Sequence, residues 1–237
     1  MSIIRNIVKF FVPVNARDYI RNAHREYVFN RAMKKFLAGP EILMQSGNPV
    51  IKDLIYGWGN ESWSALDEYL IGCIERAQRL DGPILECGSG LSTILVGAIA
   101  QSRGNRHFAL EHVPEWAKRV QGCLDKYKID SVTLSAKPLK DYGEFSWYDA
   151  PMDVMPESFA MVICDGPPGA TKGGRYGLGP VMSQHLKAGC VIMLDDAGRE
   201  QELATAKRWE TELDATSTPI GLNKPYMEMT VGTQNFI

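Results

Sequence analysis

From about residue 60 onward, short apolar runs alternate with segments whose apolar residues recur at helical spacing. The runs cover residues 83–87, 106–111, 131–135, 159–164 and 190–194, and the clearest helical patterns cover 63–79 and 199–213. Two more runs, 216–220 and 226–231, flank a Gly/Asn/Pro turn and predict a terminal pair of strands. The sequence therefore predicts an α/β domain whose seven-stranded, mostly parallel sheet has helices on both faces and an antiparallel C-terminal strand.

The first 60 residues differ from the rest and predict an N-terminal helical extension to a domain over 61–237. Up to Pro40 there are eight basic residues and two acidic ones, so this segment carries about +6 and the remainder about −8. Such a segment could bind an anionic substrate or a membrane surface, pack as a lid or a self-association arm, or form a solvated helix face. These alternatives stay open at the level of sequence.

A glycine-rich turn follows the first predicted strand. The residues are Glu86, Gly88, Ser89, Gly90 and Ser92, with Ser92 in the place of the third glycine of a dinucleotide fingerprint. The glycines permit a tight turn, and the following helix offers free N–H groups to an anionic group. In a parallel sheet, ligands bind at the carboxyl ends of the strands, so this turn is a candidate binding element.

An acidic residue ends the second predicted strand. Glu111 lies 21 residues after Gly90, where a carboxylate can accept hydrogen bonds from both hydroxyls of an adenosine ribose. The alternative is a carboxylate that caps the helix opened by Pro114. Together the turn and the acid favour an adenosine-containing cofactor, with His112 next to its adenine.

In these segments the chain resembles the class I S-adenosylmethionine-dependent methyltransferases, which have a Rossmann-like fold. The pattern at 86–90, Glu111, the segment 164–169 and the terminal strand pair carry the resemblance. Within that class, the segments 147–148, 175–176 and 194–199 are similar to a bacterial group associated with sugar and surface-polysaccharide modification. The resemblance implies that the 86–92 turn contacts the methionine part of the cofactor, that Glu111 binds ribose, and that Trp63 closes over the cofactor.

Three carboxylates follow the fourth and fifth predicted strands. Asp165 ends one strand, and Asp195 and Asp196 end the next, so all three are expected to converge in one cleft. Three oxygen ligands suit Mg²⁺ or Mn²⁺, which would bind the acceptor hydroxyls and lower the pKa of the attacked one. In the alternative reading, Asp165 positions the methionine ammonium group while Asp195 and Asp196 cap a helix.

The base that removes the acceptor proton is less clear. Sugar-modifying relatives carry an acid two residues after the fourth-strand aspartate, where this chain has Pro167. Lys172, in the Gly-rich loop 169–175, is the candidate replacement, with Asp165 and Asp196 as the other candidate catalytic residues. The other reading of Lys172 and Arg175 is a solvated loop.

Taken together, these patterns predict O-methylation of a sugar, glycan or other small hydroxylated acceptor. The rivals are a nucleotide-dependent oxidoreductase, an N- or protein methyltransferase, and a binding module that kept the fold. Binding of nucleic acid is not expected, because the domain is acidic overall. Five scattered cysteines and the lack of a long apolar run predict a protein of the reducing cytoplasm.

Overall fold

A computed structural model describes residues 14–44, 48–60, 67–222 and 224–233. The chain divides into two compact units, Met1–Ser64 and Ala65–Ile237. In the first unit, α2 (Val14–Ala38) is followed by the 3₁₀ helix η1 (Pro40–Met44) and by α3 (Val50–Trp58). None of the described helices is long and apolar enough to cross a bilayer.

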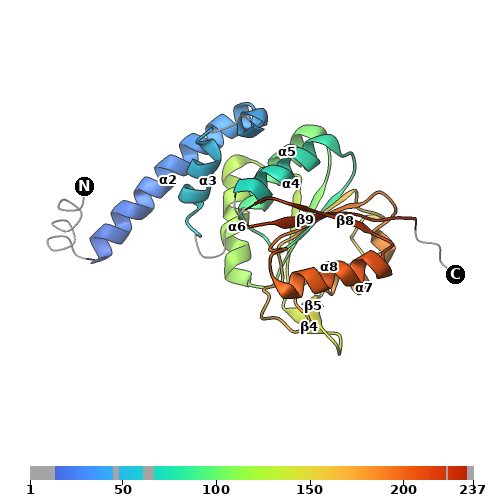
Figure 1. Cartoon of the computed structure of the whole chain (residues 1–237). Coiled ribbons are helices and arrows are strands. Elements are labelled where there is room, and N and C mark those ends of the chain that lie inside the picture. The colour runs from blue at the N-terminus through green and yellow to red at the C-terminus, as the bar shows by residue number, and fades with distance from the viewer. Residues whose placement is uncertain (1–13, 45–47, 61–66, 223, 234–237) are drawn as a thin grey trace. The chain divides into compact units, whose positions relative to one another are not determined.

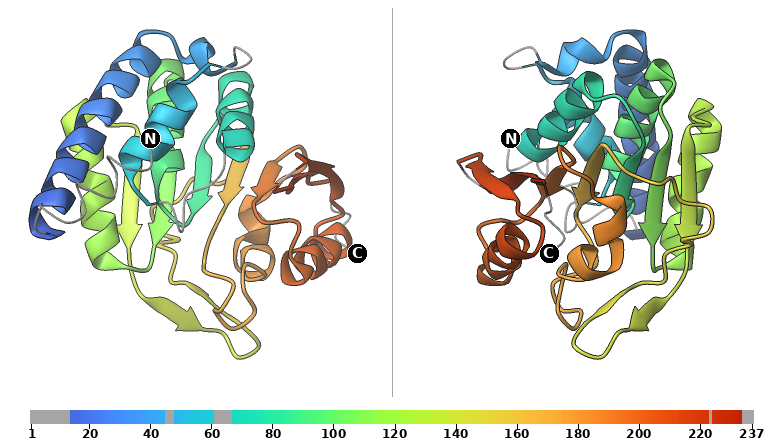
Figure 2. Two further views of the ribbon diagram at one scale, coloured as in Figure 1. Left: turned by 60° about the vertical axis from the view of Figure 1, so that its left-hand side comes forward. Right: turned by 90° about the vertical axis from the view of Figure 1, so that its right-hand side faces the viewer.

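The second unit is built on a seven-stranded sheet with the order β3-β2-β1-β6-β7-β9-β8 (Figures 1 and 2). Its parallel strands are β1 (Ile84–Cys87), β2 (His107–Glu111), β3 (Val132–Ala136), β6 (Met161–Cys164) and β7 (Val191–Leu194). The antiparallel edge consists of β8 (Thr216–Ile220) and β9 (Tyr226–Thr230), with β9 paired to β7. The predicted Rossmann-like sheet and its antiparallel C-terminal strand are confirmed.

Helices cover both faces of this sheet. On one face lie α4 (Asp67–Arg79) and α5 (Leu91–Arg103), with α6 (Pro114–Tyr127) following β2, and on the other lie α7 (Leu178–Met182) and α8 (Glu200–Glu212). The second face holds the main hydrophobic cluster, in which Trp147 and Trp209 are fully buried against alternate residues of the strands. This burial on both faces explains why the strands are continuously apolar rather than alternating.

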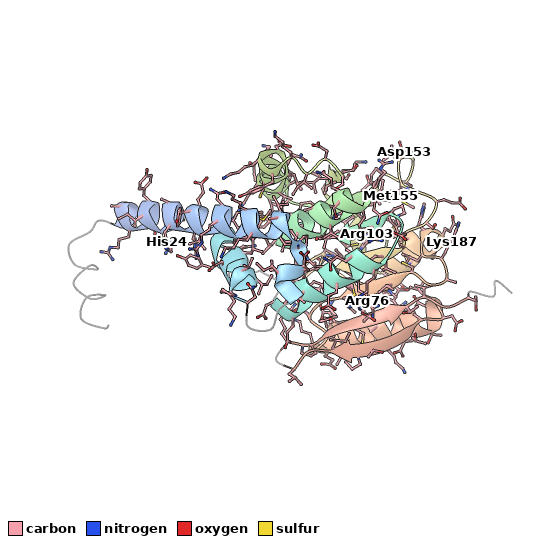
Figure 3. The ribbon with its side chains drawn as sticks, turned by 90° about the horizontal axis from the view of Figure 1, so that it is seen from above. His24, Arg76, Arg103, Asp153, Met155 and Lys187 are labelled. Atoms are coloured by element: carbon pink, nitrogen blue, oxygen red, sulfur yellow. The ribbon has the colours of Figure 1, made fainter. Side chains whose placement is uncertain are left out.

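Ion pairing fixes the antiparallel edge to the helical layer. Arg76 of α4, labelled in Figure 3, donates from Nε to Glu228 of β9 at 2.7 Å and forms a second bond through its Nη2. A bidentate arginine–carboxylate pair restricts both side chains. This contact positions β9 beside β7, the strand that ends at Asp195 and Asp196.

Two elements were not expected from the sequence. A hairpin of β4 (Leu139–Asp141) and β5 (Ser146–Tyr148) forms a separate two-stranded sheet after β3. Helix α3 runs through Gly57, a residue type that is unfavourable inside helices. A Cβ on Gly57 would lie 2.6 Å from Cβ of Phe29, so glycine here serves close packing of α3 on α2.

Candidate functional site

The glycine turn after β1 meets the turn after β6. Gly88 has φ +90°, and a Cβ added to it would lie 3.1 Å from both Cα and N of Gly166. Only glycine tolerates that conformation and that approach without strain. Strand β1 lies between β2 and β6, so the sheet's connectivity reverses at this junction, which is where open α/β sheets bind ligands.

The predicted cofactor residue Glu86 lies beneath the turn and is fully buried. Its Oε1 accepts a hydrogen bond from the Ser92 hydroxyl, and its Oε2 lies 3.0 Å from Nε2 of the buried His107. The contact with His107 is close but lacks hydrogen-bond geometry. As placed, Glu86 and Ser92 support the turn from inside, while the backbone of Gly88, Ser89 and Gly90 forms its surface.

Glu111 ends β2 and is drawn onto the same turn. Its Oε2 accepts bonds from the backbone N–H and the hydroxyl of Ser89, at 3.1 and 2.9 Å. Its Oε1 accepts the backbone N–H groups of His112 and Val113, at 2.7 and 2.8 Å. Burial alone would raise the pKa of Glu111, but these bonds outweigh it and hold the pKa below its usual value. A ligand hydroxyl would compete with the Ser89 hydroxyl for Oε2.

His112 lies between Glu111 and the β4–β5 hairpin. Its Nδ1 is 3.2 Å from Oε1 of Glu111, and its ring packs edge-on to Tyr148 at 6.2 Å. A quarter of its side chain remains exposed. The position beside a predicted adenine is therefore open to a ligand. Trp63, the other predicted contact, falls outside the described residues.

The three predicted carboxylates gather at the ends of β6 and β7. One oxygen from each of Asp165, Asp195 and Asp196 lies within 4.8 Å of the others. Asp196 has φ +60°, a conformation uncommon for residues other than glycine. Burial raises the pKa of Asp165 to about 8, with Asp195 and Asp196 adding to the rise and Arg175 opposing it.

Arginine 175 lies at the centre of this carboxylate cluster and is only 3% exposed. Its Nη2 donates to Oδ1 of Asp165 at 3.0 Å and to Oδ2 of Asp196 at 2.9 Å, and its Nη1 donates to the carbonyl of Asp195. The interpretation of Arg175 as part of a solvated loop is therefore wrong. Its partners come from two strands, which sequence patterns cannot bring together.

Two further cations bind the same carboxylates. Lys224, from the β8–β9 turn, lies 2.9 Å from both Asp195 and Asp196, and Arg199 lies 2.8 Å from Asp196. Three cations thus neutralise three carboxylates. The donor set for a divalent metal is present, but cations already occupy most of its oxygens. As arranged, the cluster does not fit a metal ion.

Lysine 172 does not join the cluster. Its side chain is 54% exposed, and its Nζ lies 3.5 Å from Oδ1 of Asp141 on β4. The loop carries it toward the hairpin, because the Ser146 N–H donates to the Lys172 carbonyl. The structure thus pairs the proposed base with a surface carboxylate.

Three residues near the site were given no role in the sequence analysis. Besides Lys224, these are Tyr148 on β5 and Glu202 on α8, both almost completely buried. The Tyr148 hydroxyl and both carboxylate oxygens of Glu202 have no hydrogen-bond partner within the described ranges. The sequence signals were slight: a Lys-Pro in a turn, a Trp-Tyr pair, and a glutamate on an otherwise polar helix.

Comparison of the whole fold with solved structures identifies its type. A precorrin-6y C5,15-methyltransferase from Geobacter metallireducens matches with a TM-score of 0.51 and 15% identity, over 74% of this chain and 96% of that one. This chain has the fold of the S-adenosylmethionine-dependent methyltransferases. No protein-family model and no curated protein sequence matches it.

Two further neighbours, one named as an O-methyltransferase and one as a proposed O-methyltransferase, have the same fold. The O-methyltransferase TomG from Streptomyces achromogenes, in complex with S-adenosylmethionine, matches with a TM-score of 0.50 and 15% identity, over 72% of this chain and 82% of that one. A proposed O-methyltransferase from Klebsiella pneumoniae matches with a TM-score of 0.51 and 13% identity, over 98% and 97% of the two chains.

Proposed function

We propose that the protein is an S-adenosylmethionine-dependent methyltransferase that acts on a hydroxyl group of a sugar, glycan or other small molecule. The supporting observation is the junction at the ends of β1, β2 and β6. There the glycine turn, the ionised Glu111 carboxylate and Asp165 surround one position at the reversal of the sheet. An adenosine cofactor with an amino-acid end needs such a turn, such a ribose acceptor and such a carboxylate.

In this proposal each residue has a defined role. Glu111 accepts the ribose hydroxyls after the Ser89 hydroxyl turns away, and His112 lies along the adenine. The ammonium group of the methionine part binds Asp165 and, as a cation beside it, favours the ionised form of this carboxyl, whose pKa burial raises. The sulfonium supplies the electrophilic methyl group, so the protein's main task is to align the acceptor oxygen with the methyl carbon and sulfur.

We further propose that transfer needs no divalent cation. Arg175, Lys224 and Arg199 already provide positive charge on the carboxylates that would bind one. Arg175 instead fixes Asp165 and Asp196 in place, so that these two carboxylates face the acceptor side as a rigid pair. The role of Lys172 as general base would require the loop to move away from Asp141.

The rival oxidoreductase is less consistent with this site. A dinucleotide fingerprint uses its third glycine for close helix–strand packing, whereas here Ser92 occupies that position and bonds Glu86. The sheet as a whole, with its antiparallel β9 and β8, also belongs to a fold that matches methyltransferase neighbours. All five cysteines are free thiols, which supports our proposal of a cytoplasmic location.

The test is transfer of an isotopically labelled methyl group from S-adenosylmethionine to panels of sugars, glycans and phenols. We expect labelled methyl ethers and an equal amount of S-adenosylhomocysteine, at the same rate with Mg²⁺ and with a chelator. A rate abolished by the chelator would refute the metal-free part alone. Label on nitrogen would refute oxygen as the acceptor, and an inability to bind S-adenosylmethionine would refute the function.

A further inference from the structure

Tyr148 carries an unsatisfied hydroxyl at the heart of the proposed cofactor site. The residue ends β5, is 2% exposed, and its hydroxyl has no hydrogen-bond partner in the part of the chain that the structure describes. Burial of a hydroxyl without a partner costs free energy, and native proteins rarely retain one without reason. A ligand that completes the bond would supply such a reason.

The position of this hydroxyl narrows the choice of ligand. A Cβ built on Gly166 would clash with the Tyr148 hydroxyl and lie 3.0 Å from Cα of Gly88. The hydroxyl therefore lies where the turn after β1, which leads into α5, meets the turn after β6. Burial raises the pKa of Tyr148 well above its usual value, with Cys87 and Glu111 adding to the rise, so the hydroxyl keeps its proton and remains a donor.

We propose that the Tyr148 hydroxyl donates a hydrogen bond to the carboxylate of the cofactor's methionine part. This inference rests on the proposed function, because it assumes S-adenosylmethionine in the site. Glu111 takes the ribose end, so the glycine junction is left for the amino-acid end. The N-terminus of α5 attracts a carboxylate to the same place, and the neutral Tyr148 donor adds a directed bond there.

A pair of ligands separates this role from a structural one. S-adenosylhomocysteine carries the amino-acid carboxylate, whereas 5′-methylthioadenosine has the same adenosine and thioether but lacks that group. We expect Tyr148→Phe to lower the affinity for S-adenosylhomocysteine about tenfold, as loss of a hydrogen bond to a charged group does. Its affinity for methylthioadenosine should stay within about twofold of the wild-type value. The melting temperature should stay the same or rise, because the variant removes an unsatisfied group.

The matched control is Tyr142→Phe on the same hairpin, whose hydroxyl donates to the Tyr148 carbonyl at 3.3 Å. It should leave the affinity for both ligands unchanged. Equal affinity of wild type and Tyr148→Phe for S-adenosylhomocysteine would overturn the inference while leaving the function standing. Equal weakening of both ligands would overturn it too, since the hydroxyl would then act on the shared adenosine part. Failure of the wild type to bind either ligand would refute the function itself.

A second, independent observation concerns the surface of α2. Large apolar side chains lie on the exposed face of this helix, where polar side chains are usual. Tyr19, Ile20 and Tyr27 are each at least 60% exposed, and Ala23 and Leu37 are exposed beside them. At 100° per residue these five positions fall within an arc of about 100°, which Asn30 and Lys34 also share, so they form an apolar stripe that holds two polar residues in its C-terminal half.

Positive charge runs along one edge of this apolar stripe. Arg17, Arg21, Arg31 and Lys35 fall within the adjoining arc, whereas Asp18 and Glu26 lie outside it. The described helix carries six basic and two acidic side chains, a net charge of +4 with histidine counted as neutral. An apolar stripe with tyrosines and a basic edge is the composition of a helix that lies in the plane of an anionic membrane surface.

We infer that α2 docks the protein on an anionic lipid surface through this stripe. The measurement is co-sedimentation of the full chain with vesicles of phosphatidylcholine alone or mixed with phosphatidylglycerol. Binding is expected only to the anionic vesicles and should weaken with added salt. The variant with Tyr19→Ser, Ile20→Ser and Tyr27→Ser should bind at least tenfold more weakly, and Lys34→Glu with Lys35→Glu should also weaken binding.

The control replaces exposed apolar residues of the other unit, Val154→Ser with Leu222→Ser, and should bind vesicles like the wild type. Equal binding by the Tyr19/Ile20/Tyr27 variant and the wild type would overturn the inference. A second result would also overturn it: the wild type forms a dimer that does not bind vesicles, and the same variant is a monomer. The stripe would then dock a second copy of the chain.

Discussion

Replacement of Arg175 by methionine tests the organisation of the carboxylate cluster. The change keeps most of the side chain's volume but removes its bonds to Asp165, Asp196 and the Asp195 carbonyl. Asp196 keeps Lys224 and Arg199 as partners, whereas Asp165 loses the cation nearest to it. The result is a mostly buried Asp165 carboxyl that has lost its nearest compensating charge.

The expected loss is large because Arg175 and Asp196 are buried and the Asp165 side chain is only a quarter exposed. Removing one partner of a buried ion pair costs about 3–5 kcal/mol of unfolding free energy. In a domain of 150–250 residues, each kcal/mol moves the melting temperature by about 2–4 °C. Arg175→Met should therefore melt about 6–20 °C below the wild type, while Arg208→Met, an exposed arginine paired with Glu212, should change it by about 2 °C or less.

The same variant tests whether arginine stands where a metal could bind. Removal of Arg175 frees an oxygen of Asp165, and one oxygen from each of the three carboxylates lies within 4.8 Å of the others, so a divalent cation should be able to displace Lys224 and bind there. Mg²⁺ or Mn²⁺ should then stabilise Arg175→Met, by about 2.7 kcal/mol at one hundred times the dissociation constant, and leave the wild type unchanged. Thermal melts followed by circular dichroism measure both effects. A wild type stabilised by the metal as much as the variant, or a variant as stable as the wild type, would refute the reasoning.

Three further predictions follow from single residues. Gly88→Ala should lower the free energy of unfolding by about 1–3 kcal/mol and weaken the binding of S-adenosylhomocysteine, because alanine at φ +90° is strained and its Cβ would press on Gly166. Thermal melts and binding titrations check both effects, and a variant that matches the wild type in both would contradict the prediction. The lowered pKa of Glu111 stabilises the protein above about pH 4.5, the ordinary value, and this contribution is lost as the pH falls through the folded-state pKa. The difference in denaturant midpoint between wild type and Glu111→Gln should therefore shrink at acid pH. A difference that stays constant with pH would contradict this. Glu202→Gln replaces a buried carboxyl that has no hydrogen-bond partner among the described residues, and it should raise the melting temperature by about 2–4 °C. A fall would mean that the carboxyl has a partner in solution.

The main sheet could be predicted from the sequence because each strand is a short apolar run between turn residues. All seven strands lie within two residues of the predicted ranges, since burial on both faces makes the pattern continuous. The β4–β5 hairpin could not be predicted in this way, because each of its strands has three residues. Helix α3 was hidden by Gly57, whose packing against Phe29 depends on a contact with another helix.

The site was predictable where residues follow strands directly. The gathering of Asp165, Asp195 and Asp196 follows from adjacent parallel strands, and that of Glu111 and Ser89 from the turn at the end of β1. The charges that neutralise the acids were not predictable. Lys224 reaches Asp195 across 29 residues of chain, and nothing local to either residue signals that pairing.

The most direct test of the account is calorimetric titration of the wild-type protein with S-adenosylhomocysteine, with NAD⁺ as the control ligand and Glu111→Gln as the control variant. We expect micromolar binding of S-adenosylhomocysteine that is weakened in the variant, and no binding of NAD⁺. A protein that binds NAD⁺ in preference, or whose affinity for S-adenosylhomocysteine is indifferent to Glu111, would contradict the assignment of the turn after β1 and the end of β2 as a cofactor site.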